Sequence, residues 1–320
     1  MLTLENGELM ADIDLYRLND LVCTDPVGAV QMAEDEYHTR VDRISDYVIS
    51  HERVKVILIA GPSGSGKTTS ANLIKDAITK KGRPTIVVSL DDFYRDSTDP
   101  DYPLQPDGDR DYECPESLHL DEIASTLLAI SQGEPFYIPR YDFKVGGRVE
   151  LNRHEPVANG CVIIEGLHAL NPRISKDLPS ESVVKIFISV STNVCENGTP
   201  ILSGRKMRFL RRMVRDNLYR GADAARTLSM WHDVLAAEDV YLYPYKATAD
   251  LAFDTFHEFE LGVLRSHALR LLTDEIVESD PYAAVVRAAV EKAAFLDERI
   301  VPEDSLIREF IPGGKYEDIY

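Results

Sequence analysis

The 320-residue sequence has few cysteines and no long apolar segment. Its four cysteines, Cys23, Cys114, Cys161 and Cys195, lie far apart and form no CxxC pair, which excludes a zinc-finger pattern and favours reduced thiols. No stretch approaches the roughly 20 apolar residues needed to span a bilayer. Residues 1–20 are acidic, unlike a secretory signal. We therefore expect a cytoplasmic protein without a membrane partner.

Positive charge is also scarce. The chain has 35 lysines and arginines against 54 aspartates and glutamates, a formal net charge of -19. A protein that coats nucleic acid needs a basic surface, so this composition argues against a nucleic-acid partner. No repeat of fixed period is visible, which argues against solenoids and propellers. With 44% hydrophobic residues, the chain has enough apolar side chains for a sizeable core.

Short apolar runs alternate with helical patterns along the chain. Runs typical of strands buried on both faces occur at 54–60, 84–90, 161–164 and 183–189, with a weaker one at 249–253. Helical patterns occur at 67–80, 118–131, 205–218, 222–237 and 258–272. This alternation predicts an α/β fold with a mainly parallel sheet flanked by helices. Two insertions interrupt it, at 96–115 and 192–204, and the first has the length and composition of a functional loop.

The strongest motif is GPSGSGKT, which follows the first predicted strand and opens a predicted helix. It fits the P-loop pattern G-x-x-x-x-G-K-[ST], whose backbone N–H groups surround phosphate oxygens at a helix N-terminus. Lys67 would reach the β- and γ-phosphates, and the Thr68 hydroxyl can bind Mg²⁺. A glycine-rich turn without a ligand is the alternative. We expect ATP as co-substrate with Mg²⁺, and phosphate binding by Gly61, Ser63, Gly64, Ser65, Gly66, Lys67, Thr68 and Thr69.

Acidic residues follow two further predicted strands. Asp91 and Asp92 end the second strand, at the edge of an α/β sheet where ligands bind, and a carboxylate there can accept a proton from an acceptor hydroxyl. Glu165 ends the run CVII, where it can hold Mg²⁺ directly or through water. Capping of the next turn is the alternative role for each of them. We expect Asp91 to be the catalytic base, and Thr68 and Glu165 to form the metal site.

A dense basic segment stands out in this acidic chain. For each side chain alone, a solvated helix face is the simpler interpretation. For the group, we favour an arginine lid, at about 192–237, that neutralises the transferring phosphoryl group. The segment contains Arg205, Lys206, Arg208, Arg211, Arg212 and Arg215.

Together these segments resemble a known family. GPSGSGKTT, SLDDFY, DYECPESL, PRYDFKVGGR, VIIEG and LRRMVRDNLYRG occur in the order found in the uridine kinase/phosphoribulokinase family of P-loop kinases, over about 55–260. LRRMVRDNLYRGADAARTLSMW and VPEDSLIREF further resemble the bacterial uridine-kinase-like nucleoside kinases. The resemblance implies a P-loop NTPase fold with a helical arginine lid. The kinase domain would span 53–275, between an N-terminal helical lead-in (1–52) and a C-terminal helical extension (276–320) packed on it.

The resemblance also implies roles for individual residues. Asp91 would be the base on the acceptor hydroxyl, with Lys67, Arg212 and Arg215 as the other catalytic residues. Tyr112 and Glu113 fall where uridine kinases have a Phe-Asp pair whose Asp holds the ribose hydroxyls. Tyr141 falls at the YDF tyrosine that meets the base. The expected acceptor-binding residues are Asp91, Tyr94, Tyr112, Glu113, Tyr141, Phe143, Arg148 and Arg212.

Three positions depart from the uridine kinase pattern. Gly146 replaces the histidine that contacts the pyrimidine, Ala222 replaces the second arginine of the RGR motif, and Met230 replaces a downstream glutamine. A pocket that lacks such hydrogen-bonding groups discriminates its base less strongly. The phosphoryl-transfer residues are intact, whereas the base-reading residues are altered. The pattern therefore predicts a kinase more firmly than it predicts uridine as the acceptor.

Other functions remain open at this point. A kinase of another small, neutral hydroxylated metabolite is one alternative. A kinase of a sugar phosphate would need basic groups in the acceptor pocket, whereas the charged residues of the 96–115 loop are mostly acidic. Arg95, Arg110, Arg140 and Arg148 keep a phosphorylated acceptor open. A catalytically weak ATP-binding regulatory protein is a second alternative. The chain has no NKxD tetrapeptide and no LSGGQ signature, which argues against a GTPase and an ABC-type ATPase. The expected partners are a nucleotide and a small-molecule acceptor, and a homo-oligomer is left open.

Overall fold

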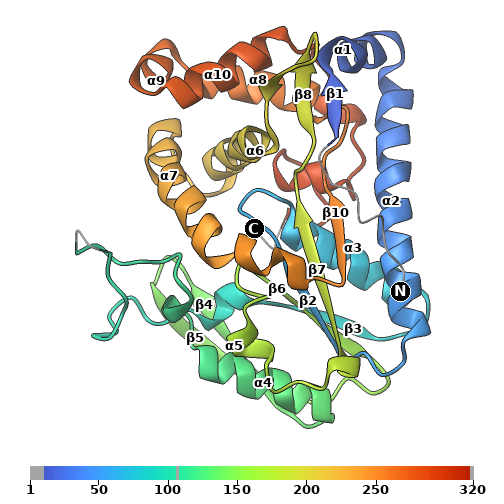
Figure 1. Ribbon diagram of the computed structural model, residues 1–320, viewed down its shortest axis with the longest axis vertical. Coiled ribbons are helices and arrows are strands. Elements are labelled where there is room, and N and C mark those ends of the chain that lie inside the picture. The colour runs from blue at the N-terminus through green and yellow to red at the C-terminus, as the bar shows by residue number, and fades with distance from the viewer. Residues whose placement is uncertain (1–10, 106–107, 318–320) are drawn as a thin grey trace.

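The computed structural model describes residues 11–105 and 108–317, and its centre is a five-stranded sheet (Figure 1). The strand order is β10-β7-β2-β6-β3, and every pairing is parallel. This confirms the predicted α/β class and all five predicted strands, with small shifts at their ends. The strands are β2 (Val56–Ala60), β3 (Thr85–Ser89), β6 (Cys161–Glu165), β7 (Val183–Ser189) and β10 (Leu251–Asp254).

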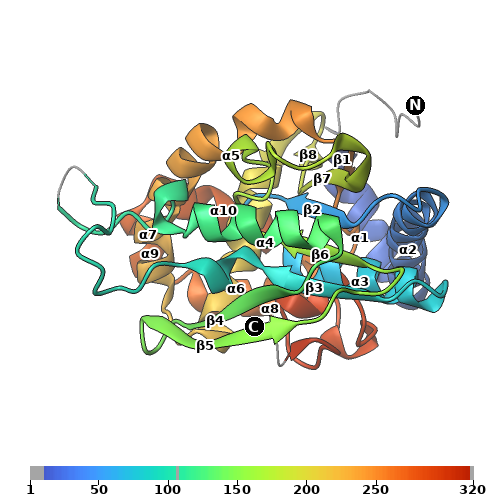
Figure 2. The same cartoon turned by 90° about the horizontal axis from the view of Figure 1, so that it is seen from below.

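The sheet separates two hydrophobic clusters, as its alternating side chains require. In β2, Ile57 and Ile59 face the cluster that contains α3, whereas Val56, Leu58 and Ala60 face the cluster that contains α4. Figure 2 shows the sheet and the helices around it from below. The helices are α2 (Pro26–Ser50), α3 (Lys67–Lys80) and α8 (Glu260–Leu271) in the first cluster, and α4 (Leu120–Gln132) and α5 (Pro172–Ser175) in the second.

Segments from both ends of the chain belong to the first cluster. α1 (Leu15–Thr24) and α2 begin at Asp14 and Asp25, whose side chains accept hydrogen bonds from backbone N–H groups of the first turn. After α9 (Asp274–Ser279) and α10 (Pro281–Lys292), the chain forms two 3₁₀ turns, η5 (Glu298–Ile300) and η6 (Leu306–Glu309). Residues 1–10 and 318–320 of the two predicted terminal regions lie outside the described residues. Within the described part of the chain, no helix has the length and apolarity of a membrane span.

The basic segment forms α6 (Gly204–Tyr219), followed by α7 (Ala224–Tyr241). α6 is a core helix, because Met207, Phe209, Leu210, Met213 and Val214 on it are almost completely buried. Its N-terminus is capped by the Ser203 side chain, which accepts from the Lys206 N–H. Helix α6 therefore packs among helices α7, α8 and α10.

Two small sheets were not predicted. β4 (Phe136–Asp142) and β5 (Gly147–His154) form an antiparallel hairpin whose side chains are mostly exposed, so they give no apolar pattern. The predicted insertion at 192–204 is a second hairpin, β8 (Asn193–Glu196) and β9 (Thr199–Leu202), which β1 (Asp12–Asp14) extends. Asn197 and Gly198 both have positive φ, as a two-residue hairpin turn requires. The Asn-Gly pair was thus the signal for this hairpin.

Candidate functional site

The predicted phosphate, base and metal residues meet at one edge of the sheet. The P-loop follows β2, Asp91 follows β3, and Glu165 ends β6. Because β2, β6 and β3 are neighbours in the sheet and run parallel, their carboxyl ends lie side by side. The register places Glu165 opposite both Ile59 and Ser89. The three segments that were predicted to cooperate are therefore adjacent.

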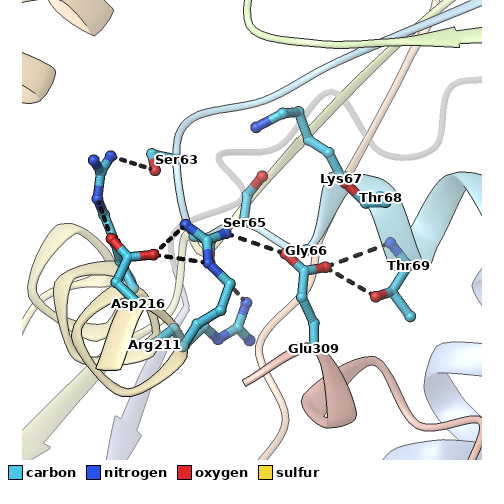
Figure 3. Close-up of polar contacts among 12 residues, drawn as sticks. Ser63, Ser65, Gly66, Lys67, Thr68, Thr69, Arg211, Asp216 and Glu309 are labelled. Atoms are coloured by element: carbon cyan, nitrogen blue, oxygen red, sulfur yellow. Dashed lines mark hydrogen bonds and ion pairs between the residues drawn. The ribbon is translucent and has the colours of Figure 1, made fainter. Parts of the chain in front are cut away.

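The P-loop itself has the features of an anion site (Figure 3). Gly66 adopts a φ of 83° at the start of α3, and no side chain caps that helix end among the described residues. Ser65 Oγ is buried and, in the part of the chain that the structure describes, has no hydrogen-bond partner. Lys67 Nζ reaches back across the loop and donates to the Pro62 carbonyl at 3.2 Å. The loop thus offers donors that phosphate oxygens can satisfy.

Thr68 and Glu165 lie together, as a shared metal site requires. Thr68 Oγ1 donates to Glu165 Oε1 at 3.5 Å. Burial raises the pKa of Glu165 to about 7; the nearby Asp91 carboxylate raises it further, and Lys67 opposes the shift. The described residues contain no group of three or more His, Cys, Asp or Glu side chains able to hold a metal. A small number of protein ligands is what a Mg²⁺ site needs, because Mg²⁺ keeps several of its waters and is bound largely through substrate phosphates.

Asp91 and Glu113 share one electrostatic environment with two cationic side chains. Burial raises the pKa of Glu113, Arg212 lowers it, Asp91 raises it, and Lys67 lowers it. Asp91 itself is exposed at the sheet edge. The expected base and the expected ribose-binding carboxylate therefore lie near the P-loop lysine and an arginine of α6. This arrangement can hold a hydroxylated acceptor close to a transferring phosphate.

Three predicted aromatic residues form a cluster beside Asp91. The ring centroids of Tyr94, Tyr141 and Phe143 lie 5.0–5.8 Å apart in pairs. Burial raises the pKa of Tyr94 well above its ordinary value, and Asp91 adds to the effect. The Tyr141 N–H donates to Asp92 Oδ1 at 3.2 Å, so the second acid of the Asp-Asp pair anchors this cluster.

The remaining acceptor residues differ in how available they are. The Tyr94 hydroxyl donates to the Tyr112 carbonyl at 3.0 Å, and Tyr112 is 48% exposed. Arg148 Nη2 donates to Glu122 Oε2 of α4 at 2.6 Å, so its charge is already paired. Gly146 has a φ of 72°, and a Cβ there would lie 2.5 Å from Ser97 Oγ. The turn between β4 and β5 thus requires glycine where uridine kinases carry their histidine.

The two arginines predicted to be catalytic lie beside the P-loop. Arg212 Nη1 donates to Ser63 Oγ at 2.8 Å, and Arg212 Nε donates to Asp216 Oδ2 at 3.2 Å. Arg215 Nη2 donates to Asp216 Oδ1 at 3.0 Å. The Asp216 carboxylate lowers the net positive charge of the pair and fixes its orientation. Arg212 therefore contacts the P-loop directly, whereas Arg215 is joined to Arg212 through their shared partner Asp216.

Arg208 and Arg211 are fully buried, so a solvated helix face is wrong for these two. Arg208 pairs with Glu238 of α7 at 2.8 Å, and Arg211 pairs with Glu260 of α8 at 2.6 Å. Both pairs hold the P-loop. Arg208 Nη1 donates to the Ser63 carbonyl at 2.8 Å, Glu238 Oε1 accepts from the Ser63 N–H at 2.8 Å, and Arg211 Nη1 donates to the Gly64 carbonyl at 3.3 Å.

Other residues at the site were not identified from the sequence. His168 is buried, and its Nε2–H donates to the Glu113 carbonyl at 3.0 Å. Burial lowers the pKa of His168 to about 4, so the ring is neutral. Glu309, from η6, accepts from Thr69 Oγ1 at 2.9 Å. His168 follows Glu165 closely and could have been singled out by its position, whereas Glu309 reaches the loop from 240 residues away.

The five-stranded parallel sheet and the GKT loop define a P-loop NTPase fold. Residues 56–261 match the model of the Phosphoribulokinase / Uridine kinase family, and the chain belongs to this family. This confirms the resemblance that the motifs indicated.

Curated relatives match the same part of the chain. It is 30% identical over 180 residues to the uridine kinase of Schizosaccharomyces pombe, covering 56% of this chain and 36% of that protein. It is 29% identical over 215 residues to the uridine kinase-like protein 5 of Arabidopsis thaliana, covering 65% and 42%. It is 27% identical over 202 residues to the uridine kinase of Deinococcus deserti, covering 63% and 87%. The chain thus spans less than half the length of these two eukaryotic relatives.

Proposed function

We propose that the protein is an ATP-dependent phosphotransferase that moves the γ-phosphoryl group of ATP to an alcohol, the 5′-hydroxyl of a nucleoside. The observation that carries the proposal is the meeting of the P-loop, Asp91, Glu165 and Arg212 at one sheet edge. Family membership supports it, and so do the relatives named uridine kinase.

Each residue has a defined part in this reaction. Asp91 orients the acceptor hydroxyl and takes its proton as the hydroxyl oxygen bonds to the γ-phosphorus. The bond from that phosphorus to the bridging oxygen breaks, and ADP leaves. Lys67, Arg212 and Arg215 offset the negative charge of the phosphates. Thr68 and Glu165 would hold Mg²⁺, which neutralises charge on the β- and γ-phosphates when bound.

The surroundings of Asp91 favour a neutral acceptor with a flat ring. Tyr94, Tyr141 and Phe143 offer aromatic faces, and Glu113 offers a carboxylate to ribose hydroxyls. Arg148 is paired with Glu122, so it is not a free cation for a phosphorylated acceptor. These contacts favour a nucleoside over a sugar phosphate. We also propose a cytoplasmic location, which suits a chain whose four cysteines are free thiols.

The test is an ADP-release assay with Mg²⁺ and ATP against nucleosides, small polyols and sugar phosphates. We expect stimulation by a nucleoside, and a loss of roughly 10²-fold or more in Asp91→Asn with ATP binding retained. Asp101→Asn, which changes an exposed carboxylate in the following loop, is the matched control. Near-normal turnover in Asp91→Asn would refute the role of the base.

The acceptor panel also separates the alternatives. Stimulation by a sugar phosphate alone would favour a phosphoribulokinase-like reaction over the proposed one. ATP binding without stimulation by any compound would favour the catalytically weak regulatory protein.

A further inference from the structure

The C-terminal segment 301–311 packs directly on the P-loop. Leu306, Ile307, Phe310 and Ile311 are fully buried. A Cβ on Gly66 would lie 2.7 Å from Leu306 Cδ1, so the segment is in contact with the backbone that opens α3. Its first polar contact, from Ser305 Oγ to Glu34, joins it to α2. The wall beside the phosphate loop is therefore formed by residues far away in the sequence.

One side chain of this segment, the Glu309 carboxylate, accepts hydrogen bonds from donors at the start of α3 (Figure 3). Glu309 Oε2 accepts from Thr69 Oγ1 at 2.9 Å and from the Thr69 N–H at 3.4 Å. Thr69 is the third residue of α3, so its N–H is one of the donors that a helix N-terminus presents to an anion. Glu309 Oε1 also lies 3.5 Å from Arg215 Nη1. A carboxylate thus has both a loop donor and a phosphate-neutralising arginine as partners.

We propose that Glu309 competes with nucleotide phosphate for Thr69 and Arg215, and so limits the affinity of the site for nucleotide. The inference rests on the proposed function only in that the P-loop binds ATP. A phosphate group and the Glu309 carboxylate carry like charges and would use the same donors, so they cannot occupy that position together. Binding of ATP therefore requires the carboxylate to leave Thr69, which releases Arg215 toward the phosphates.

Glu309→Gln tests the charge while keeping the shape. The amide can still accept from Thr69, and Arg215 keeps Asp216 as a partner at 3.0 Å, so no buried cation is left unpaired. Glu303→Gln changes an exposed carboxylate in the same segment and is the matched control. The dissociation constant of Mg²⁺·ATP is measured by titration calorimetry on the full chain without an acceptor.

We expect Glu309→Gln to bind ATP about tenfold more tightly than the unaltered protein, and Glu303→Gln to bind it equally. Unchanged or weaker binding in Glu309→Gln would overturn the proposal. Because no acceptor is present, this result is independent of phosphoryl transfer. A protein that binds ATP but phosphorylates nothing would refute the proposed function and leave this inference standing.

A second measurement uses the unaltered chain, so it stays informative if the variant fails to fold. Among the described residues, Glu309 makes the polar contacts between η6 and the P-loop. Loss of these contacts should loosen the turn. We expect hydrogen exchange at the amides of residues 306–310 to become faster with saturating Mg²⁺·ATP. Equal or slower exchange would mean that Glu309 stays in place and would overturn the proposal.

Discussion

At the scale of single residues, Glu34 is a carboxylate placed where its charge has little compensation. It is 2% exposed, and its Oε2 atom has no hydrogen-bond partner in the described part of the chain. Burial raises the pKa of Glu34 to about 7, although the hydrogen bond from Ser305 opposes the shift. His257 Nε2 lies 3.9 Å away, but burial lowers the pKa of that ring to about 3, so it stays neutral. The folded protein is therefore most stable when Glu34 is protonated.

Glu34→Gln should stabilise the protein at alkaline pH. In the unfolded chain Glu34 ionises near its ordinary pKa of 4.5, whereas in the folded chain it ionises near 7. Between these values the folded state binds more protons, so the wild-type protein loses stability as pH rises through this window, with no further loss above it. Gln does not titrate. We expect the variant to be more stable by up to about 3 kcal/mol at pH 8 and nearly equal at pH 4.5, in urea unfolding.

The control is Glu36→Gln, an exposed residue of the same helix that pairs with Arg40. Its effect should stay below about 1 kcal/mol, because exposed ion pairs contribute little. A Glu34→Gln variant with the same pH dependence of stability as the wild-type protein would show that Glu34 has the same pKa in the folded and unfolded states.

At the scale of elements, the P-loop takes its shape from helices that are remote in the sequence. Glu238 of α7 accepts from the Ser63 N–H, and Arg208 of α6 donates to the Ser63 carbonyl. The two side chains pair with each other in a fully buried ion pair. Thr255, after β10, donates to the Ser65 carbonyl at 2.8 Å. The loop is thus held at successive residues before any ligand binds, which favours tight and specific phosphate binding.

Separate variants can distinguish stability from loop positioning in this ion pair. Glu238→Gln leaves Arg208 buried without a counter-charge and should cost about 3–5 kcal/mol in the free energy of unfolding. The double variant Arg208→Met/Glu238→Leu removes both charges and should recover most of that stability. It leaves both backbone groups of Ser63 without these partners, so we expect KM for ATP to rise while stability is near normal. Steady-state kinetics and thermal unfolding measure the two effects.

The exposed pair next to it provides the control. Asp239 is adjacent to Glu238 and Arg205 lies three residues before Arg208, but the two side chains are 52% and 43% exposed. Asp239→Asn should change neither stability nor KM appreciably. An unchanged KM for ATP in the folded double variant would mean that the buried pair stabilises α6 and α7 without positioning the loop.

These contacts also show what the sequence could predict. The sheet strands and the helices around them were predicted because buried parallel strands give continuous apolar runs. The P-loop, Asp91 and Glu165 were predicted because each is defined by its local position after a strand. Glu238 and Glu309 contact the loop across sequence separations of 175 and 240 residues, and no local sequence pattern predicts such long-range contacts. The β4–β5 hairpin was missed because its exposed side chains do not alternate.

At the scale of the whole molecule, one hydrophobic cluster joins the two ends of the chain to the sheet. It includes Ile13 and Leu18 near the start, Ile59 of β2, and Phe310 and Tyr316 near the end. The Arg211 guanidinium lies over the Phe310 ring at 5.1 Å, so the cluster continues into the ion pair that supports the P-loop. Burial of this kind couples elements into one cooperative unit.

The chain should therefore unfold in one transition, and a cavity near its end should destabilise all of it. Phe310 is fully buried, so Phe310→Ala should cost about 3–5 kcal/mol and lower the melting temperature of the entire protein by about 10 °C. Phe295, which is 58% exposed in the same C-terminal region, is the matched control, and Phe295→Ala should change stability by less than about 0.5 kcal/mol. Calorimetry distinguishes a single cooperative transition from two separate ones. If a separate, lower transition appeared in Phe310→Ala while the main transition kept its temperature, the C-terminal region would be an independently folding part, and its contact with the P-loop could break without loss of the sheet.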